Sequence, residues 1–494
     1  MSLIKVTNLT FAYDGSYDNI FEDVSFQIDT NWKLGFTGRN GRGKTTFLNL
    51  LLGKYDYSGT ISAGVSFDYF PFHVADKENN TIDIITDLYP DYEHWQLMRE
   101  LSLLKVSEDV LYRPFESLSN GEQTKVLLAA LFLKENSFLL IDEPTNHLDI
   151  HARKLVSEYL RGKSGFILVS HDRSFLDNCV DHILSINKTN IEIQRGNFSD
   201  WWENKQRQDN WELAENEKLK KDIKRLSDAA KRTNDWSHEV EKTKNGTRNS
   251  GSKVDKGYIG HKAAKMMKRS KSIEQRQQSS IDERSQLLKN VESSESLKIT
   301  QLAYHKHQLA ELDHVAIQYG EKSVCRDVSF TIEQGDRIAL TGPNGSGKSS
   351  LLKLICGEDI PHSGVFRKGS QLKISYVSQD TSHLRGNLTD FARSSEIDES
   401  LFKAILRKLD FSRLQFEKDI ASYSGGQKKK VLIAKSLCER VHLHVWDEPL
   451  NFIDVISRIQ IEELLLEHSP TILFVEHDSE FSKRIATKTV ELNG

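Results

Sequence analysis

Short apolar runs that end in a polar residue recur along the chain, and they predict the buried strands of α/β domains. They fall into two matching sets, at residues 34–37, 138–142 and 166–170 in the first half and at 338–341, 445–447 and 472–476 in the second. Residues 1–10 add a further strand at the start of the chain. Each half spans about 200 residues, which is enough for one α/β domain with its own core.

A different pattern separates the two halves. Between 203 and 290 apolar residues are sparse, but several recur at helical spacing: Leu219, Ile223, Leu226 and Ala230, and then Met266, Ile273, Leu287, Leu288 and Val291. This periodicity predicts two long antiparallel helices. Glycines 246, 251, 257 and 260 predict a tip between them, near 241–262. We therefore expect a first domain at 1–202, a helical hairpin at 203–300 and a second domain at 301–494.

A glycine-rich segment of the form G-x-x-x-x-G-K-[ST] follows the first strand of each set, and its two copies lie 304 residues apart. In such loops, glycines let backbone N–H groups converge on phosphate oxygens, the lysine adds charge and the hydroxyl reaches Mg²⁺. The next helix points its positive end at the same anion. The residues expected to bind ATP are Gly38, Asn40, Gly41, Gly43, Lys44, Thr45 and Thr46 in the first copy, and Gly342, Asn344, Gly345, Gly347, Lys348, Ser349 and Ser350 in the second. The chain is therefore predicted to be a tandem ATPase in which Thr45 and Ser349 contact Mg²⁺.

A carboxylate pair ends the second strand of each set. Asp142 and Asp447, 305 residues apart, are expected to hold Mg²⁺ through water. Glu143 and Glu448 follow them directly, where a base can polarise the attacking water. After the third strand of each set comes a histidine, His171 or His477, which is expected to touch the γ-phosphate. The predicted catalytic residues are these two glutamates and two histidines.

A capping box opens a helix in each half, with the form Ser119-x-x-Glu122 and Ser424-x-x-Gln427. The glycines beside these caps, Gly121 in the first half and Gly425 and Gly426 in the second, leave the helix N-terminus open to an anion. The pattern is therefore compatible with capping and with phosphate binding at once.

Together these motifs resemble the ATP-binding cassette (ABC) superfamily. The resemblance implies that the two domains pair head to tail within one chain, so that each capping-box helix completes the site of the other half. Site one would join 38–45, Asp142, Glu143 and His171 to 424–427, and site two would join 342–349, Asp447, Glu448 and His477 to 119–123. The resemblance also implies that Tyr13 and Tyr319 stack on adenine.

The two halves differ at one position that bears on the metal. The superfamily places a glutamine near Mg²⁺ and the attacking water, and Gln379 matches it in the second half. Phe72 stands at the matching place in the first half, and a phenylalanine cannot ligate a metal. Because both halves keep the glutamate base, we expect two competent but unequal sites.

The segment 203–290 is basic, with 22 Lys+Arg against 14 Asp+Glu, although the whole chain carries a net charge of −4. The positive charge is concentrated at 241–271, with Trp236 just before this range and Tyr258 within it. A charge run is usually a solvated spacer, but a basic hairpin with aromatic residues suits RNA, through backbone phosphates and base stacking. The predicted RNA contacts are Lys242, Lys244, Arg248, Lys253 and Lys256.

Tandem cassettes joined by a basic connector of about 90 residues resemble the ABC-F family of ribosome-associated ATPases. Three features are most similar to the Lsa-type antibiotic-resistance members. They are Phe72, the long connector and the segment 448–454, whose sequence departs from the matching segment 143–149 of the first half. For this type, the resemblance implies binding in the exit site of the bacterial 70S ribosome, beside 23S rRNA and P-site tRNA. It also implies displacement of lincosamide, pleuromutilin and streptogramin A antibiotics.

The remaining sequence narrows the alternatives. No apolar run approaches the ~20 residues of a membrane span, the first residues lack the apolar stretch of a signal peptide, and four scattered cysteines predict reduced thiols. We therefore expect a cytoplasmic protein, a monomer whose cassettes pair intramolecularly, with no membrane subunit and no DNA partner. Two alternatives remain: a general translation regulator without a drug role, and the ATPase subunit of an importer.

Overall fold

The computed structural model describes residues 2–14, 19–72, 74–134, 136–146, 148–187, 190–243, 265, 268, 271, 275, 301–320, 322–343 and 345–492. Within these ranges, the side chains of 226, 227, 229–243, 322 and 323 are not described. Contacts divide the chain into two compact units, one comprising Met1–Trp201 and Ser296–Gly494 and the other Trp202–Glu295.

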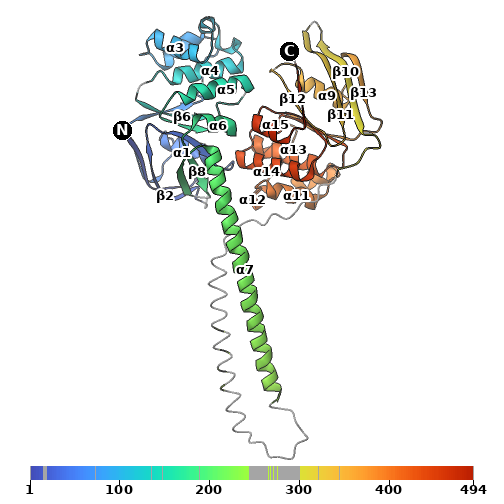
Figure 1. Cartoon of the computed structure of the whole chain (residues 1–494). Coiled ribbons are helices and arrows are strands. Elements are labelled where there is room, and N and C mark those ends of the chain that lie inside the picture. Colours follow the sequence, from blue (N-terminus) through green and yellow to red (C-terminus); the bar gives the residue numbers. More distant parts are fainter. Residues whose placement is uncertain are drawn as a thin grey trace, which may run out of the picture. The chain divides into compact units, whose positions relative to one another are not determined.

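The first half is an α/β domain (Figure 1). Its strands are β1 Leu3–Phe11, β2 Phe21–Asp29, β3 Lys33–Thr37, β4 Ser58–Ser62, β5 Ser66–Phe70, β6 Ser137–Asp142, β7 Phe166–Val169, β8 His182–Asn187 and β9 Asn190–Arg195. The strands form an antiparallel sheet, β2-β1-β4, and a six-stranded sheet, β5-β6-β7-β3-β8-β9, which is parallel except for the β8–β9 pair. The helices are α1 Lys44–Leu51, α2 Thr81–Leu88, α3 His94–Leu103, α4 Asn120–Leu131, α5 Ile150–Arg161 and α6 Arg173–Cys179, with 3₁₀ turns η1 Glu108–Tyr112 and η2 Phe115–Ser117.

The second half repeats this arrangement. Its strands are β10 Gln308–Tyr319, β11 Lys322–Glu333, β12 Arg337–Thr341, β13 His362–Lys368, β14 Ile374–Val377, β15 Leu443–Asp447, β16 Ile472–Val475 and β17 Lys488–Glu491. They form an antiparallel sheet, β11-β10-β13, and a parallel sheet, β14-β15-β16-β12-β17. The helices are α9 Lys348–Cys356, α10 Leu388–Ser394, α11 Glu399–Lys408, α12 Arg413–Phe416, α13 Gly425–Cys438, α14 Val455–His468 and α15 Ser479–Ile485, with a 3₁₀ turn η3 Ile420–Ser422.

The strands predicted from the apolar runs are confirmed. They correspond to β3, β6 and β7 in the first half and to β12, β15 and β16 in the second, and the opening strand is β1. In each large sheet the strand before the glycine loop pairs in parallel with the strand that precedes the histidine, which in turn pairs with the strand that carries the carboxylates. Their carboxyl ends therefore meet at one edge, where open α/β sheets bind ligands.

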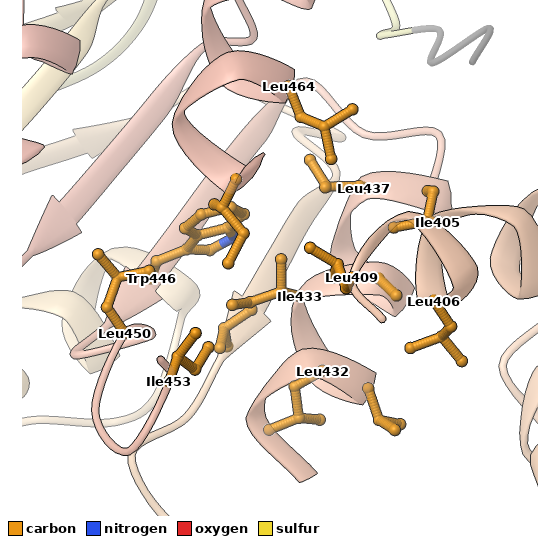
Figure 2. Close-up of a cluster of buried hydrophobic side chains, with 14 of the residues drawn as sticks. Ile405, Leu406, Leu409, Leu432, Ile433, Leu437, Trp446, Leu450, Ile453 and Leu464 are labelled. Atoms are coloured by element: carbon orange, nitrogen blue, oxygen red, sulfur yellow. The ribbon is translucent and has the colours of Figure 1, made fainter. Parts of the chain in front are cut away.

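Both faces of the parallel sheet in the second half are buried. In β15, Leu443 and Val445 belong to a core shared with β10, β11 and α9, whereas Trp446 faces a second core. That second core is built from helices α11, α13 and α14, and Figure 2 shows Trp446 in one cluster with Ile433, Leu437 and Leu464. Strands covered on both sides explain the continuous apolar runs, and they fix the position of Asp447 at the end of β15.

The connector begins with a single long helix, α7 Phe198–Thr243, of 46 residues (Figure 1). The prediction of a helix over the first part of the connector is confirmed, and at 1.5 Å per residue this helix is about 70 Å long. The predicted tip, 241–262, lies outside the described residues from 244 onward, as does the return arm except for 265, 268, 271 and 275, which are helical. Of the described helices, none is long and apolar enough to cross a membrane.

Candidate functional site: two composite sites between the halves

Each glycine loop leads from a strand end into a helix. Gly43 and Gly347, at the N-termini of α1 and α9, have φ of 99° and 81°. A Cβ on Gly43 would lie 2.6 Å from Ile20 Cγ2, and one on Gly347 would lie 3.0 Å from the Val324 carbonyl oxygen. Both the left-handed backbone and the crowding therefore require glycine here.

The two loop lysines lie inside their own loops. Lys44 Nζ donates to the carbonyl oxygens of Gly38 at 2.7 Å and Arg39 at 3.2 Å, and Lys348 Nζ donates to those of Gly342 at 2.9 Å and Pro343 at 2.7 Å. Burial lowers the pKa of both lysines, although nearby carboxylates oppose this shift. The ammonium groups are thus placed at the centre of each loop, where a polyphosphate would meet them. Asn344 lies outside the described residues.

The strand-end aspartates meet the hydroxyls that follow the lysines. Thr45 Oγ1 donates to Asp142 Oδ2 at 3.1 Å, and the Ser349 hydroxyl hydrogen-bonds Asp447. Asp447 Oδ1 is buried and, among the described residues, has no hydrogen-bond partner. A hydroxyl and a buried carboxylate oxygen are ligands that suit Mg²⁺, so this chemistry fits the metal, which would neutralise phosphate charge when bound. Thr45 with Asp142, and Ser349 with Asp447, would hold it.

Each glutamate is paired with the histidine of the same half. His171 Nε2 lies 3.2 Å from Glu143 Oε1, and His477 Nε2 lies 3.3 Å from Glu448 Oε1. Burial favours the neutral form of both glutamates. For Glu143, burial and the charge of Asp142 raise the pKa to about 8.

For Glu448, burial also acts upward, but hydrogen bonds from His477 and Asn451 outweigh it and lower the pKa. Gln379 contributes a further contact, because its Nε2 donates to Glu448 Oε2 at 2.8 Å. Phe72 instead packs edge-on against Tyr89, with ring centroids 6.4 Å apart. The two halves therefore differ at this place: Glu448 has a lowered pKa and a contact from Gln379, whereas Glu143 has a raised pKa and the first half has Phe72 in place of the glutamine.

Both predicted capping boxes are confirmed. The Glu122 side chain accepts from the Ser119 backbone N–H at 2.9 Å, and the Gln427 side chain accepts from the Ser424 backbone N–H at 3.0 Å. The hydroxyls of the two serines accept in return from the backbone N–H of residues 122 and 427. These contacts fix the starts of α4 and α13, while the backbone N–H groups of the first turn stay directed outward.

The structure brings each of these helix starts to the opposite glycine loop. A cavity of about 720 Å³ is lined by 119–122 from the first half and, from the second, by Gly345, Gly347, Lys348, Ser349, Glu448 and His477. At the other site, Asn40 Nδ2 donates to the Phe452 carbonyl oxygen at 2.7 Å, and a Cβ on Gly426 would lie 3.1 Å from the same nitrogen. These contacts match the two composite sites that the superfamily resemblance implies.

The two tyrosines lie beside the loops and remain partly exposed, at 42% for Tyr13 and 45% for Tyr319. Tyr13 OH is 2.7 Å from Thr46 Oγ1, and Tyr319 OH donates to Ser350 Oγ at 3.2 Å. Each ring is therefore held next to the glycine loop, with exposed surface on which an adenine ring could stack.

Several residues at the sites were missed by the sequence analysis. Asp149 and Asp454, 305 residues apart, cap helices α5 and α14 and place negative charge near the glycine-loop lysine of the opposite half. Arg153 Nη1 donates to the His477 carbonyl oxygen at 3.3 Å, again across the two halves. The repeat offset of 305 residues was the signal that could have found the two aspartates, and it marks Arg153 as well, because Arg458 stands at the same offset.

The predicted RNA contacts cannot be placed in the same way. Lys242 lies in α7 but its side chain is not described, and Lys244, Arg248, Lys253 and Lys256 lie outside the described residues.

Comparison with known proteins identifies the family. The family model described as ABC transporter matches residues 21–146 and 325–451, about half of the chain. The ATP-binding protein Uup of Caulobacter vibrioides is 27% identical over 490 residues, which cover 96% of this chain and 75% of that protein. The ribosome protection protein VmlR of Bacillus subtilis is 27% identical over 489 residues, which cover 98% and 85%.

Among solved structures, the archaeal ribosome recycling factor aABCE1, in complex with the stalk protein aP1, matches with a TM-score of 0.64 at 18% identity. The match covers 99% of this chain and 87% of that one, and it shows a shared fold. Because the family model matches once in each half, over the glycine loop and the carboxylate strand, this chain belongs to the ABC transporter family and is an ATP-hydrolysing enzyme with two tandem ABC ATPase domains.

Proposed function

We propose that this protein is an ABC-F-type ATPase whose two halves close on two Mg²⁺–ATP molecules and thereby hold the protein on the bacterial 70S ribosome. The observation that carries the proposal is the cavity in which the start of α4 faces Lys348, Glu448 and His477. Such a site is complete only when both halves contribute, so the γ-phosphate can bias their closure.

At each site, different side chains would bind the phosphates and assist hydrolysis. The loop lysine and the first-turn N–H groups of the opposite helix would bind the phosphates. Glu448 would accept a proton from the attacking water, and His477, 3.3 Å away, would orient that carboxylate. Glu143 and His171 would do the same at site one. Hydrolysis would remove the γ-phosphate that joins the halves, and the protein would then leave the ribosome.

The ribosomal partner is supported by a relative and by the connector. VmlR, a protein named for ribosome protection, aligns with 98% of this chain, connector included. The connector segment 203–290 carries 22 Lys+Arg against 14 Asp+Glu, with the excess concentrated at 241–271, and basic side chains bind RNA backbones through phosphate contacts. We propose that the connector tip contacts 23S rRNA and P-site tRNA in the exit site, through Lys242, Lys244, Arg248, Lys253 and Lys256.

We further propose that this binding displaces lincosamide, pleuromutilin and streptogramin A antibiotics from the peptidyl-transferase centre, in the cytoplasm where ribosomes work. This part rests on the similarity to the Lsa-type proteins described above. A general translation regulator would bind the same ribosome without changing drug sensitivity, so the two functions differ in one measurable property.

Drug susceptibility of a sensitive bacterium that expresses the protein tests this difference. The wild type should raise the inhibitory concentrations of the three drug classes. A variant with Gln in place of Lys242, Lys244, Arg248, Lys253 and Lys256 should not. The matched control replaces five exposed cassette lysines, Lys5, Lys105, Lys306, Lys353 and Lys368, with Gln and should protect like the wild type. A wild type that binds ribosomes but leaves all three drugs equally potent would favour the general regulator.

A further inference from the structure

A tyrosine stands next to the metal-binding aspartate in both halves. Tyr69 pairs with Leu140 in the β5–β6 register, and Tyr376 pairs with Val445 in the β14–β15 register. Asp142 and Asp447 each lie two residues beyond these partners, and residues two apart in a strand face the same side of the sheet. The register therefore aims each tyrosine at the neighbouring carboxylate.

The hydroxyls reach their targets. Tyr69 OH donates to Asp142 Oδ2 at 3.0 Å, and Tyr376 OH donates to Asp447 Oδ2 at 3.4 Å. Burial and the charge of the aspartate raise the pKa of both tyrosines, so each hydroxyl keeps its proton and remains a donor. The same contact at the same place in both halves indicates a purpose shared by the two sites.

Each contact engages one oxygen of the carboxylate. In the first half, Tyr69 and Thr45 both donate to Asp142 Oδ2. In the second half, Tyr376 donates to Asp447 Oδ2, while Oδ1 is buried and without a partner among the described residues. A donor on one oxygen fixes the rotation of the carboxylate and leaves the other oxygen free for the metal shell.

The two halves differ in the other side chains that surround the tyrosine–aspartate contact. Gln379, three residues after Tyr376, donates to Glu448. In the first half the corresponding Phe72 packs on Tyr89, and the Lys54 ammonium lies 5.5 Å from the centre of the Tyr69 ring. Site one thus has the shorter tyrosine contact and lacks the glutamine.

We propose that Tyr69 and Tyr376 are positioning residues that orient the Mg²⁺-binding aspartates, and that site one depends more strongly on its tyrosine because Phe72 replaces the glutamine. This inference rests on the proposed Mg²⁺–ATP sites. The substitutions Tyr69→Phe and Tyr376→Phe remove only the hydroxyl and keep the ring.

The test measures binding of a fluorescent ATP analogue to the whole protein, with Mg²⁺ and again with EDTA. Lys348→Ala isolates site one for Tyr69→Phe, and Lys44→Ala isolates site two for Tyr376→Phe. Loss of a group that orients a metal ligand typically weakens metal affinity by about 10–100-fold. We expect affinity in Mg²⁺ to fall by roughly that factor for Tyr69→Phe and by less for Tyr376→Phe. Affinity in EDTA should stay unchanged.

Tyr159→Phe provides the control, because it removes another buried hydroxyl of the first half, 2.6 Å from Glu100 Oε2 and away from the site. It should not change the ratio of affinities in Mg²⁺ and EDTA. Equal losses in Mg²⁺ and EDTA, or no loss for either tyrosine variant, would overturn the inference. A wild type whose affinity does not depend on Mg²⁺ would instead contradict the proposed site itself.

Discussion

Glu143 and Glu448 share a backbone conformation that glutamates seldom adopt, with φ of 52° and 46°. Each N–H donates to the last residue of the neighbouring strand, Val169 at 2.9 Å or Val475 at 3.1 Å. A left-handed conformation costs a residue with a Cβ about 1–2 kcal/mol. Because the same strain is held at the same place in both halves, the sheet edge determines where each carboxylate points, which suits the proposed role of the two glutamates as catalytic bases.

Single substitutions of the two glutamates should have unequal effects. Glu448 is hydrogen-bonded by Gln379 and Asn451 and has a lowered pKa, whereas the pKa of Glu143 is raised. At pH 7 the second site therefore holds the ionised base. Because a general base contributes roughly 10²–10⁴-fold, we expect Glu448→Gln to remove most of the steady-state phosphate release and Glu143→Gln to remove a smaller part.

Glu158→Gln, an exposed change on α5, serves as the control and should keep the wild-type rate. Equal rates of phosphate release in the two single variants would show that the sites do not differ in the way their surroundings indicate.

At the scale of secondary structure, the buried strand β15 carries two side chains with polar nitrogen atoms, His444 and Trp446. His444 Nδ1 lies 3.0 Å from Ser436 Oγ, and Trp446 Nε1 donates to the same oxygen at 2.9 Å. Ser375 Oγ donates to it at 2.8 Å. This network joins β14, α13 and β15 directly behind Asp447, and it satisfies polar groups that would otherwise destabilise the core.

The buried histidine predicts an acid-sensitive second domain. Burial lowers the pKa of His444 to about 4, so it stays neutral in the folded protein while the unfolded chain binds a proton below pH 6.5. Neutral His444 therefore costs no stability above pH 6.5. As the pH falls from 6.5 toward 4, the free energy of unfolding decreases, by about 3 kcal/mol in total. Lowering the pH from 7 to 5 should reduce the urea concentration at the unfolding midpoint, and this reduction should be smaller in His444→Gln than in the wild type.

The exposed His362→Gln is the matched control, since it removes a histidine from the surface of the same domain. Identical pH dependence in the wild type and His444→Gln would mean that this histidine is not held neutral by the fold.

Local patterns predicted the elements well, because their information lies within a few residues. The apolar runs gave the strands, the glycine loops gave the starts of α1 and α9, and Ser119 and Ser424 gave two helix caps. The polar network around Ser436 could not be predicted, because Ser375 lies 61 residues from Ser436 along the chain, and one sequence does not reveal such pairing. Asp149 and Asp454 were visible as a repeat, but their role depends on the opposite half.

At the scale of the whole molecule, the two halves are joined by charged side chains as well as by the ATP sites. Glu462 of α14 is fully buried and binds Arg173 of α6, with an Nη1–Oε2 distance of 3.2 Å, and Arg484 of α15 at 3.1 Å. Arg39 and Asp410 form another pair at 2.9 Å. Removing one partner of a buried pair typically costs about 3–5 kcal/mol, so the Arg173–Glu462 contact favours the paired arrangement of the halves. The sequence could not reveal it, because the partners are 289 residues apart and have no counterpart in the repeat.

The central claim is that ATP binding by both halves holds the protein on the ribosome. The most direct test is co-sedimentation of the Glu143→Gln/Glu448→Gln double variant with bacterial ribosomes, with ATP and without nucleotide. Removing both bases should leave ATP bound, so the account predicts that the variant pellets with ribosomes in ATP and stays in the supernatant without nucleotide. A variant that stays in the supernatant with ATP at every salt concentration would contradict the account.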